Sequence, residues 1–258
     1  MKKPQKILVP FDFSKTSKNA LQYAIDYVGL DDNLKIVLAY ISNHDNQDLL
    51  EEAFGSIRSK YGLNLKHEMQ WLSFSGTLSN AILYIQKEED INLIIMGTSG
   101  DEDEEESNTS HLVLKADCPV LVIPKVYSEF KMKNVVLVLG TNEIEDNKTL
   151  ATLLDVARRF NAKVHVITIK NKPMEYGYSE IDEKNESKIQ YYLENFYSEH
   201  TFIENPDIVE GIMDYSKHHD IDAIVILPRN HSTKSAPSEG QLTEILTLKS
   251  EIPVLAID

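Results

Sequence analysis

Glycine and hydroxyl residues with the spacing of an anion site lie between residues 97 and 108. Gly97 and Gly100 follow an apolar run, and Ser107 and Asn108 open a segment of helical period. A glycine-rich turn lets backbone amides approach a phosphate, and the N-terminus of the next helix offers unpaired N–H groups at its positive dipole end. A tight strand-to-helix turn without a ligand is the other interpretation, because so short a glycine signal also occurs in turns.

Six consecutive acids, residues 101–106, fill the middle of this segment. Two like charges about 4 Å apart repel by about 1 kcal/mol even in water, and a triphosphate would meet several of them. Carboxylates can bind Ca²⁺ or Mg²⁺, but this run lacks the alternating ligands and the turn glycine of a calcium loop. We therefore expect a solvated loop and predict no metal.

Asp12 follows the first apolar run, residues 7–11, and precedes Ser14. Ser14 is a typical N-cap, and apolar positions after it repeat at three and four residues through Val28, as in an amphipathic helix. One interpretation of Asp12 is therefore that it caps N–H groups at the start of this helix. The other interpretation, a contact to adenosine, depends on a family resemblance described below.

Length, net charge and cysteine content exclude several classes of protein. A chain of 258 residues with 42% apolar content can fill one large core or two of ordinary size. The net charge of −15 opposes binding to a nucleic-acid backbone, and no apolar run approaches the roughly 18 residues of a membrane helix. The single cysteine, Cys118, is expected to be a small buried hydrophobe. The N-terminal apolar stretch is too short for a signal peptide, so we expect a cytoplasmic protein with neither nucleic-acid nor membrane partners.

Short β-branched runs alternate with longer segments of helical period, which predicts an α/β fold with a parallel sheet covered by helices. The expected strands are residues 7–11, 34–41, part of 65–74, 92–96, 120–123, 135–139, 163–169, 201–204, 223–227 and 254–257. The expected helices are residues 14–28, 47–61, 79–88, 108–115, 145–160, 181–197 and 207–217. Gly97 is expected to begin the loop after the fourth strand.

The second half of the chain repeats the first. DINLIIM at residues 90–96 matches DIDAIVI at 220–226, an offset of 130, whereas KADCPVLVI at 115–123 matches KSEIPVLAI at 249–257, an offset of 134. Between these two matches the first copy is therefore four residues shorter than the second. The difference falls on the loop that carries the glycines and the acids.

Four motifs resemble those of the universal stress protein family: VPFDFS at residues 9–14, MGTSG at 96–100, SNT at 107–109 and CPVLVIP at 118–124. The resemblance covers the whole chain, twice. It implies two tandem doubly wound domains with five-stranded parallel sheets, Rossmann-like and of the adenine nucleotide alpha hydrolase-like type, at residues 1–128 and 129–258. It also implies that the last strands of the two domains pair, so that one chain forms its own pseudo-dimer; a further homodimer is left open.

In nucleotide-binding members of this family an aspartate after the first strand meets the adenine and ribose, and Asp12 matches it. The phosphates lie on a motif of two glycines, nine further residues and a third glycine before Ser or Thr. Gly97 and Gly100 match the first two glycines, but only five residues separate Gly100 from Glu106, which stands in the place of the third. The resemblance therefore implies family membership without an intact ATP-binding motif.

The second copy departs from the motif in another way. Leu227 and Asn230 replace the first two glycines, Gly240 keeps the spacing of the third, and Gly140 replaces Asp12. We therefore expect a non-enzymatic stress-response or regulatory binding module whose partner is an unknown protein or small molecule. The alternative is an adenine-nucleotide-binding protein with weak ATPase or switch activity, using Asp12, Gly97, Gly100, Ser107 and Asn108. No nucleophile elbow, P-loop or GxGxxG motif is found, so no catalytic residue is predicted and the cofactor is unknown.

Two further groups of residues allow more than one interpretation. Three histidines, His218, His219 and His231, could hold a metal but lack a fixed second pair of ligands, which favours surface histidines. Five tyrosines in the second half either pack against other elements or line a small-molecule pocket. They are Tyr176, Tyr178, Tyr191, Tyr192 and Tyr197.

Overall fold

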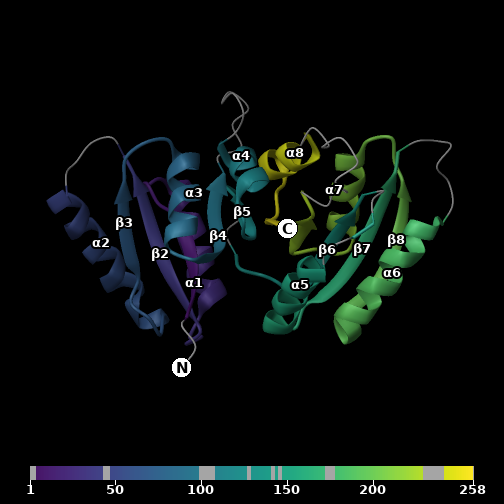
Figure 1. Ribbon diagram of the computed structural model, residues 1–258, viewed down its shortest axis with the longest axis horizontal. Helices are drawn as coiled ribbons and strands as arrows, with labels where there is room; N and C mark the ends of the chain where they lie inside the picture. Colours follow the sequence, from purple (N-terminus) through teal and green to yellow (C-terminus); the bar gives the residue numbers. More distant parts are fainter. Residues whose placement is uncertain are drawn as a thin grey trace. The chain divides into compact units, whose positions relative to one another are not determined.

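Short apolar runs form parallel strands in the computed structural model, which describes residues 4–42, 47–98, 108–126, 129–140, 143–144, 147–171, 178–228 and 241–257. The chain divides into two units, residues 1–130 and 131–258. In each unit the strands lie side by side and the helices run alongside them (Figure 1). Both units have the doubly wound α/β fold.

The first unit has five parallel strands in the order β3-β2-β1-β4-β5. They are β1 (Gln5–Pro10), β2 (Leu34–Ile41), β3 (Gln70–Phe74), β4 (Ile91–Thr98) and β5 (Val120–Pro124). The helices are α1 (Lys15–Val28), α2 (Gln47–Tyr61), the short η1 (Gly62–Asn64), α3 (Leu78–Glu88) and α4 (Asn108–Lys115). Ile7, Leu8 and Val9 of the central β1 are at most 1% exposed, as expected for a strand covered on both faces.

The second unit repeats this plan with the strand order β10-β9-β6-β7-β8. Its strands are β6 (Asn134–Leu139), β7 (Lys163–Lys170), β8 (Tyr197–Glu204), β9 (Ala223–Ile226) and β10 (Val254–Ala256). Its helices are α5 (Asn147–Phe160), α6 (Glu180–Leu193), the short η2 (Glu194–Phe196), α7 (Ile208–His218) and α8 (Gln241–Lys249). Val135, Val136 and Leu137 of β6 are fully buried.

Three predicted boundaries were wrong. The helix expected over residues 181–197 ends at Leu193, because Glu194 takes a left-handed backbone with φ 48° and its amide bonds to the Gln190 carbonyl. The following strand, expected only from residue 201, begins at Tyr197. Strand β4 continues to Thr98, so Gly97 lies inside the strand and not in the loop after it.

None of the helices in the described parts of the chain is both long and apolar enough to cross a membrane.

Candidate ligand site at the carboxyl ends of the strands

Asp12 lies just beyond the carboxyl end of β1. Its Oδ1 accepts a hydrogen bond from the Ser14 amide at 2.9 Å, and the residue is exposed to solvent. Partial burial opposes ionisation, but hydrogen bonds from Ser14 and Ser17 outweigh it and hold the pKa of Asp12 below its ordinary value. Asp12 is therefore an ionised side chain that organises the backbone before α1 and still faces solvent.

Ser14 caps α1, as the sequence predicted. Its side-chain oxygen accepts a hydrogen bond from the Ser17 amide at 3.1 Å, and the Ser17 hydroxyl lies 3.2 Å from the Ser14 carbonyl oxygen. Such a cap satisfies one of the amides that have no partner within the helix. The first turn of α1 is thereby fixed directly beside Asp12.

Phe13, between Asp12 and Ser14, has a left-handed backbone with φ 64°, which residues with bulky side chains rarely adopt. Its ring contacts Phe11 at a centroid distance of 5.0 Å and Phe54 of α2 at 5.3 Å. Phe54 in turn stacks on Trp71 of β3 at 4.8 Å. These aromatic contacts support a strained turn that presents Asp12 at a fixed place.

Gly97 approaches the first turn of α1 very closely. A Cβ atom at this position would lie 2.6 Å from Thr16 Cγ2 and 2.7 Å from the Thr16 carbonyl oxygen. Only glycine lets β4 and α1 come so near without a shift of backbone. The fold therefore brings Gly97 and Asp12 to the same helix turn, and packing supplies a reason for this glycine that involves no ligand.

The structure does not describe the other residues of the predicted phosphate site in the same detail. Gly100 and Ser107 lie outside the described residues, as do the acids at 101–106. Asn108 begins α4, but its side chain is likewise outside the described part. The role of all three in binding phosphate stays a prediction.

The corresponding edge of the second unit is built differently. Gly140, in the place of Asp12, follows β6 and has no side chain to offer. Nearby Ile144 is fully buried, and its amide donates to Asn185 Oδ1 at 2.9 Å. Its carbonyl accepts from Lys188 Nζ, so α6 holds this residue at two points. Leu227 is half-buried, while Asn230 and Gly240 lie outside the described residues.

A polar layer that the sequence reasoning missed lies between α6 and strands β7 and β8. Lys170 Nζ and Asp182 Oδ2 form an ion pair at 3.2 Å, with side chains 11% and 6% exposed. Asp182 also accepts from the amide and hydroxyl of Ser179, completing a capping box at the start of α6. The Ser-x-x-Asp spacing could have identified this cap from the sequence.

His200 extends this layer on β8. Its Nε2 lies 2.9 Å from Thr168 Oγ1, and its ring packs against Phe202 at a centroid distance of 4.3 Å. Burial disfavours the charged imidazolium and lowers the pKa of His200, although the carboxylates of Glu186 and Asp182 act in the opposite direction. His200 is therefore held neutral at physiological pH and serves packing.

The predicted tyrosine group divides into two. Tyr178 and Tyr197 both donate to Glu186 of α6, and the hydrogen bond to Glu186 raises the pKa of Tyr178 to about 12. Tyr191, which is 77% exposed, contacts Tyr192 edge to face at 5.5 Å. Tyr176 lies outside the described residues. Two of the four described tyrosines are therefore in ring contact and the other two share one carboxylate, and a pocket lined by them stays a prediction.

The histidines bond to their own helix. His218 Nδ1 lies 2.7 Å from the Asp214 carbonyl and His219 Nδ1 3.0 Å from the Tyr215 carbonyl, while His231 lies outside the described residues. In the part of the chain that the structure describes, no group of three His, Cys, Asp or Glu residues could hold a metal ion. Cys118 is buried two residues before β5.

The two parallel sheets, each with its loops at the carboxyl ends of the strands, define the class of doubly wound α/β proteins that bind ligands at this edge. The profile of the universal stress protein family matches residues 3–124 and again residues 131–258. The chain belongs to the universal stress protein family and contains two copies of its domain. No curated protein sequence matches the chain significantly.

Three solved structures share the fold over nearly the whole chain. A universal stress protein from Archaeoglobus fulgidus DSM 4304 is 14% identical, with a TM-score of 0.72 over 98% of this chain and 96% of that one. A protein of Pseudomonas aeruginosa UCBPP-PA14 assigned to the same family is 16% identical, with a TM-score of 0.64 over 98% and 92%. The cytoplasmic domain of a prokaryotic cation chloride cotransporter is 11% identical, with a TM-score of 0.61 over 99% and 95%. The TM-scores establish a shared fold, whereas identities this low do not establish a shared ligand.

Proposed function

We propose that this chain is a non-enzymatic stress-response or regulatory binding module that does not hold a nucleoside triphosphate at the carboxyl ends of its strands. The observation that carries the proposal is the sequence between β4 and α4. It is four residues shorter than its counterpart in the second copy and contains six consecutive acids at residues 101–106. A polyphosphate at this place would meet like charges, each repelling it by about 1 kcal/mol at about 4 Å in water.

The described residues around this segment support the proposal. Gly97 is accounted for by its approach to Thr16, so one of the two matching glycines has a reason to be present without a phosphate. In the second unit Gly140 brings no carboxylate, and Leu227 stands in the place of the first glycine. The partner of the module is then a protein or a small molecule other than ATP.

Adenine-nucleotide binding through the first unit, with weak ATPase or switch activity, is the second candidate. One observation favours it: Asp12 is exposed and ionised beyond β1, with its Oδ1 bonded to the Ser14 amide. A ribose hydroxyl could donate to such a carboxylate, and a charge-assisted hydrogen bond of this kind is worth about 1.5–3 kcal/mol.

Isothermal titration of the full chain with Mg-ATP distinguishes the two candidates. We expect no binding heat up to about 1 mM nucleotide, which corresponds to a binding free energy weaker than about −4 kcal/mol. Titration of adenosine, which lacks phosphates, is the matched ligand control. If adenosine binds where Mg-ATP does not, the acidic segment is what excludes the phosphates.

Two variants make the titration specific for the site. Asp12→Asn keeps an oxygen that can accept from the Ser14 amide but removes the charge, and Asp26→Asn makes the same change at an exposed position of α1. Micromolar Mg-ATP binding that Asp12→Asn abolishes and Asp26→Asn leaves intact would refute the proposal and establish the second candidate.

Two predictions about the whole chain are unchanged. The pairing of the last strands of the two units rests on the family resemblance, and a location in the cytoplasm stays a prediction. A further homodimer is compatible with both candidates.

A further inference from the structure

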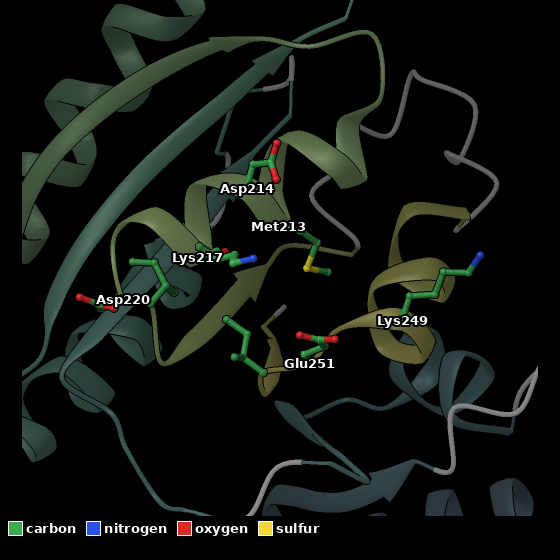
Figure 2. Close-up of a pocket in the computed structure, with 9 residues that line it drawn as sticks. Met213, Asp214, Lys217, Asp220, Lys249 and Glu251 are labelled. Atoms are coloured by element: carbon green, nitrogen blue, oxygen red, sulfur yellow. The ribbon is translucent and has the colours of Figure 1, made fainter.

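A hollow of about 520 Å³ lies in the second unit, between α7 and the turn that joins α8 to β10 (Figure 2). Small-molecule sites typically measure roughly 300–1,000 Å³, so this hollow is of sufficient size. It lies toward the amino ends of β9 and β10, because α7 ends just before β9 and the turn after α8 leads directly into β10. The carboxyl-end loops discussed above lie at the opposite edge of the same parallel sheet.

The first unit contains the same elements and serves as an internal comparison. Helices α3 and α7 span residues 78–88 and 208–218, an offset of 130, and α4 and α8 end at residues 115 and 249, an offset of 134. The backbone repeats as well, since Asp90 and Asp220 both take left-handed conformations with φ 52° and 48°. Ser216 therefore corresponds to Gln86, Lys217 to Lys87 and Glu251 to Asp117.

In the first unit, side chains bridge this space. Gln86 is only 7% exposed, and its Oε1 accepts a hydrogen bond from the Asp117 amide at 3.3 Å. Lys87 Nζ lies 3.9 Å from Asp117 Oδ2. The helix and the turn are thereby tied together by an amide side chain and an ion pair.

In the second unit, both ties are missing. Ser216 is shorter than glutamine, and its hydroxyl donates to the Ile212 carbonyl at 2.7 Å, within its own helix. Lys217 and Glu251 form no ion pair with each other, although both line the hollow, Lys217 from α7 and Glu251 from the turn after α8. Figure 2 shows the Lys217 side chain extending toward the middle of the hollow and Glu251 lying across from it.

Three of the other residues that line the hollow are apolar. Met213 reaches into the hollow in Figure 2, and Ile221 and Ile252 also line it. The hollow thus offers Lys217 and Glu251 on separate walls with apolar surface between them, while the side chain of Lys249, which also lines it, points away from its middle in Figure 2. A ligand with one kind of charge would be attracted by one wall and repelled by the other, and the further acids Asp214 and Asp220 disfavour polyanions.

We propose that this hollow binds a small zwitterion with an apolar body, such as a short peptide with unmodified ends. Its carboxylate pairs with Lys217, its ammonium group pairs with Glu251, and its apolar side chains cover Met213, Ile221 and Ile252. Ser216 is shorter than Gln86, its counterpart in the first unit, and so leaves room for this ligand. This proposal is independent of the carboxyl-end site, so the Mg-ATP titration does not decide it.

The test is titration of the isotope-labelled full chain with the dipeptide Leu-Leu, followed by amide and methyl NMR shifts. We expect saturable shifts around Met213, Ser216 and Glu251, and no such shifts with the acetylated and amidated dipeptide, which carries neither charge. Lys217→Met should weaken binding about tenfold, the effect of one lost charge-assisted bond. Lys87→Met, the same change at the matching position of the first unit, should leave the affinity unchanged.

A second variant tests whether binding requires the space beside Ser216. Ser216→Gln introduces the residue that the first unit has at this position, and it should abolish the shifts. The proposal is overturned if Leu-Leu causes no saturable shifts up to about 10 mM, a limit of weak binding. It is also overturned if the capped dipeptide binds equally well, or if Lys87→Met weakens binding as much as Lys217→Met.

Discussion

Gly97→Ala is expected to lower the free energy of unfolding of the first unit by about 2–3 kcal/mol, at the upper end of what overpacking costs. The new Cβ would lie 2.7 Å from the Thr16 carbonyl oxygen, a backbone atom that cannot move without displacing the first turn of α1. Denaturant unfolding followed by tryptophan fluorescence measures this, because the single tryptophan, Trp71, lies in β3 of the first unit.

Gly55→Ala is the matched control. Gly55 lies inside α2, and a Cβ there would meet no atom within 4 Å. This variant should be as stable as the native chain or more stable by up to about 1 kcal/mol, the difference in helix propensity between alanine and glycine. If Gly97→Ala proved equally harmless, packing would no longer explain Gly97, and a phosphate contact would become the better explanation.

The second large effect is expected for Asp182→Ala. This change leaves the Lys170 ammonium group buried without its partner and removes the capping box of α6. Breaking a buried ion pair by removing one partner costs about 3–5 kcal/mol. Unfolding of the variant, followed by circular dichroism, should show a loss of that size.

Glu143→Ala provides the comparison for Asp182→Ala. Glu143 and Lys184 also form an ion pair, at 3.7 Å, but their side chains are 44% and 61% exposed. Solvent screens such a pair, so its loss should cost at most about 1 kcal/mol. Equal losses in the two variants would show that burial does not distinguish the pairs and would contradict the interpretation of the polar layer.

The stability that the ion pair of Lys170 and Asp182 contributes should depend on pH. Partial burial opposes ionisation of Asp182, but its hydrogen bonds to Ser179 and the charge of Lys170 outweigh this and lower its pKa in the folded state. A lowered pKa contributes stability that is present above the unfolded value, about 3.9, and lost as the pH falls through the folded value. The difference in stability between the native chain and Asp182→Ala should therefore shrink below about pH 4.

Local signals in the sequence were sufficient to predict much of the fold. Ser14 followed by apolar residues at helical spacing predicted both the start and the end of α1, and the β-branched runs predicted the central strands. The end of α6 was missed because tyrosines at residues 191, 192 and 197 fit both a helix and a strand. Only the left-handed backbone of Glu194 separates the two elements.

The candidate sites were less predictable because they depend on contacts between distant segments. Asp12 could be identified by its place after the first strand, whereas the approach of Gly97 to Thr16 has no local signal in the sequence. The ion pair of Lys170 and Asp182 is equally non-local. The hollow near Ser216 is likewise formed by two segments that are separate in the sequence, α7 and the turn after α8.

The layer beneath α2 is aromatic, with Phe54 on Trp71, whereas the layer beneath α6 contains Lys170, Asp182 and His200. Burial of aromatic surface carries a large heat capacity, so the contribution of that layer weakens on cooling. The hydration of charges becomes less favourable with heat, so the ionic layer costs less at high temperature. We therefore expect cooling to weaken both layers, whereas of these two layers only the ionic one contains an ion pair that acid breaks, through protonation of Asp182.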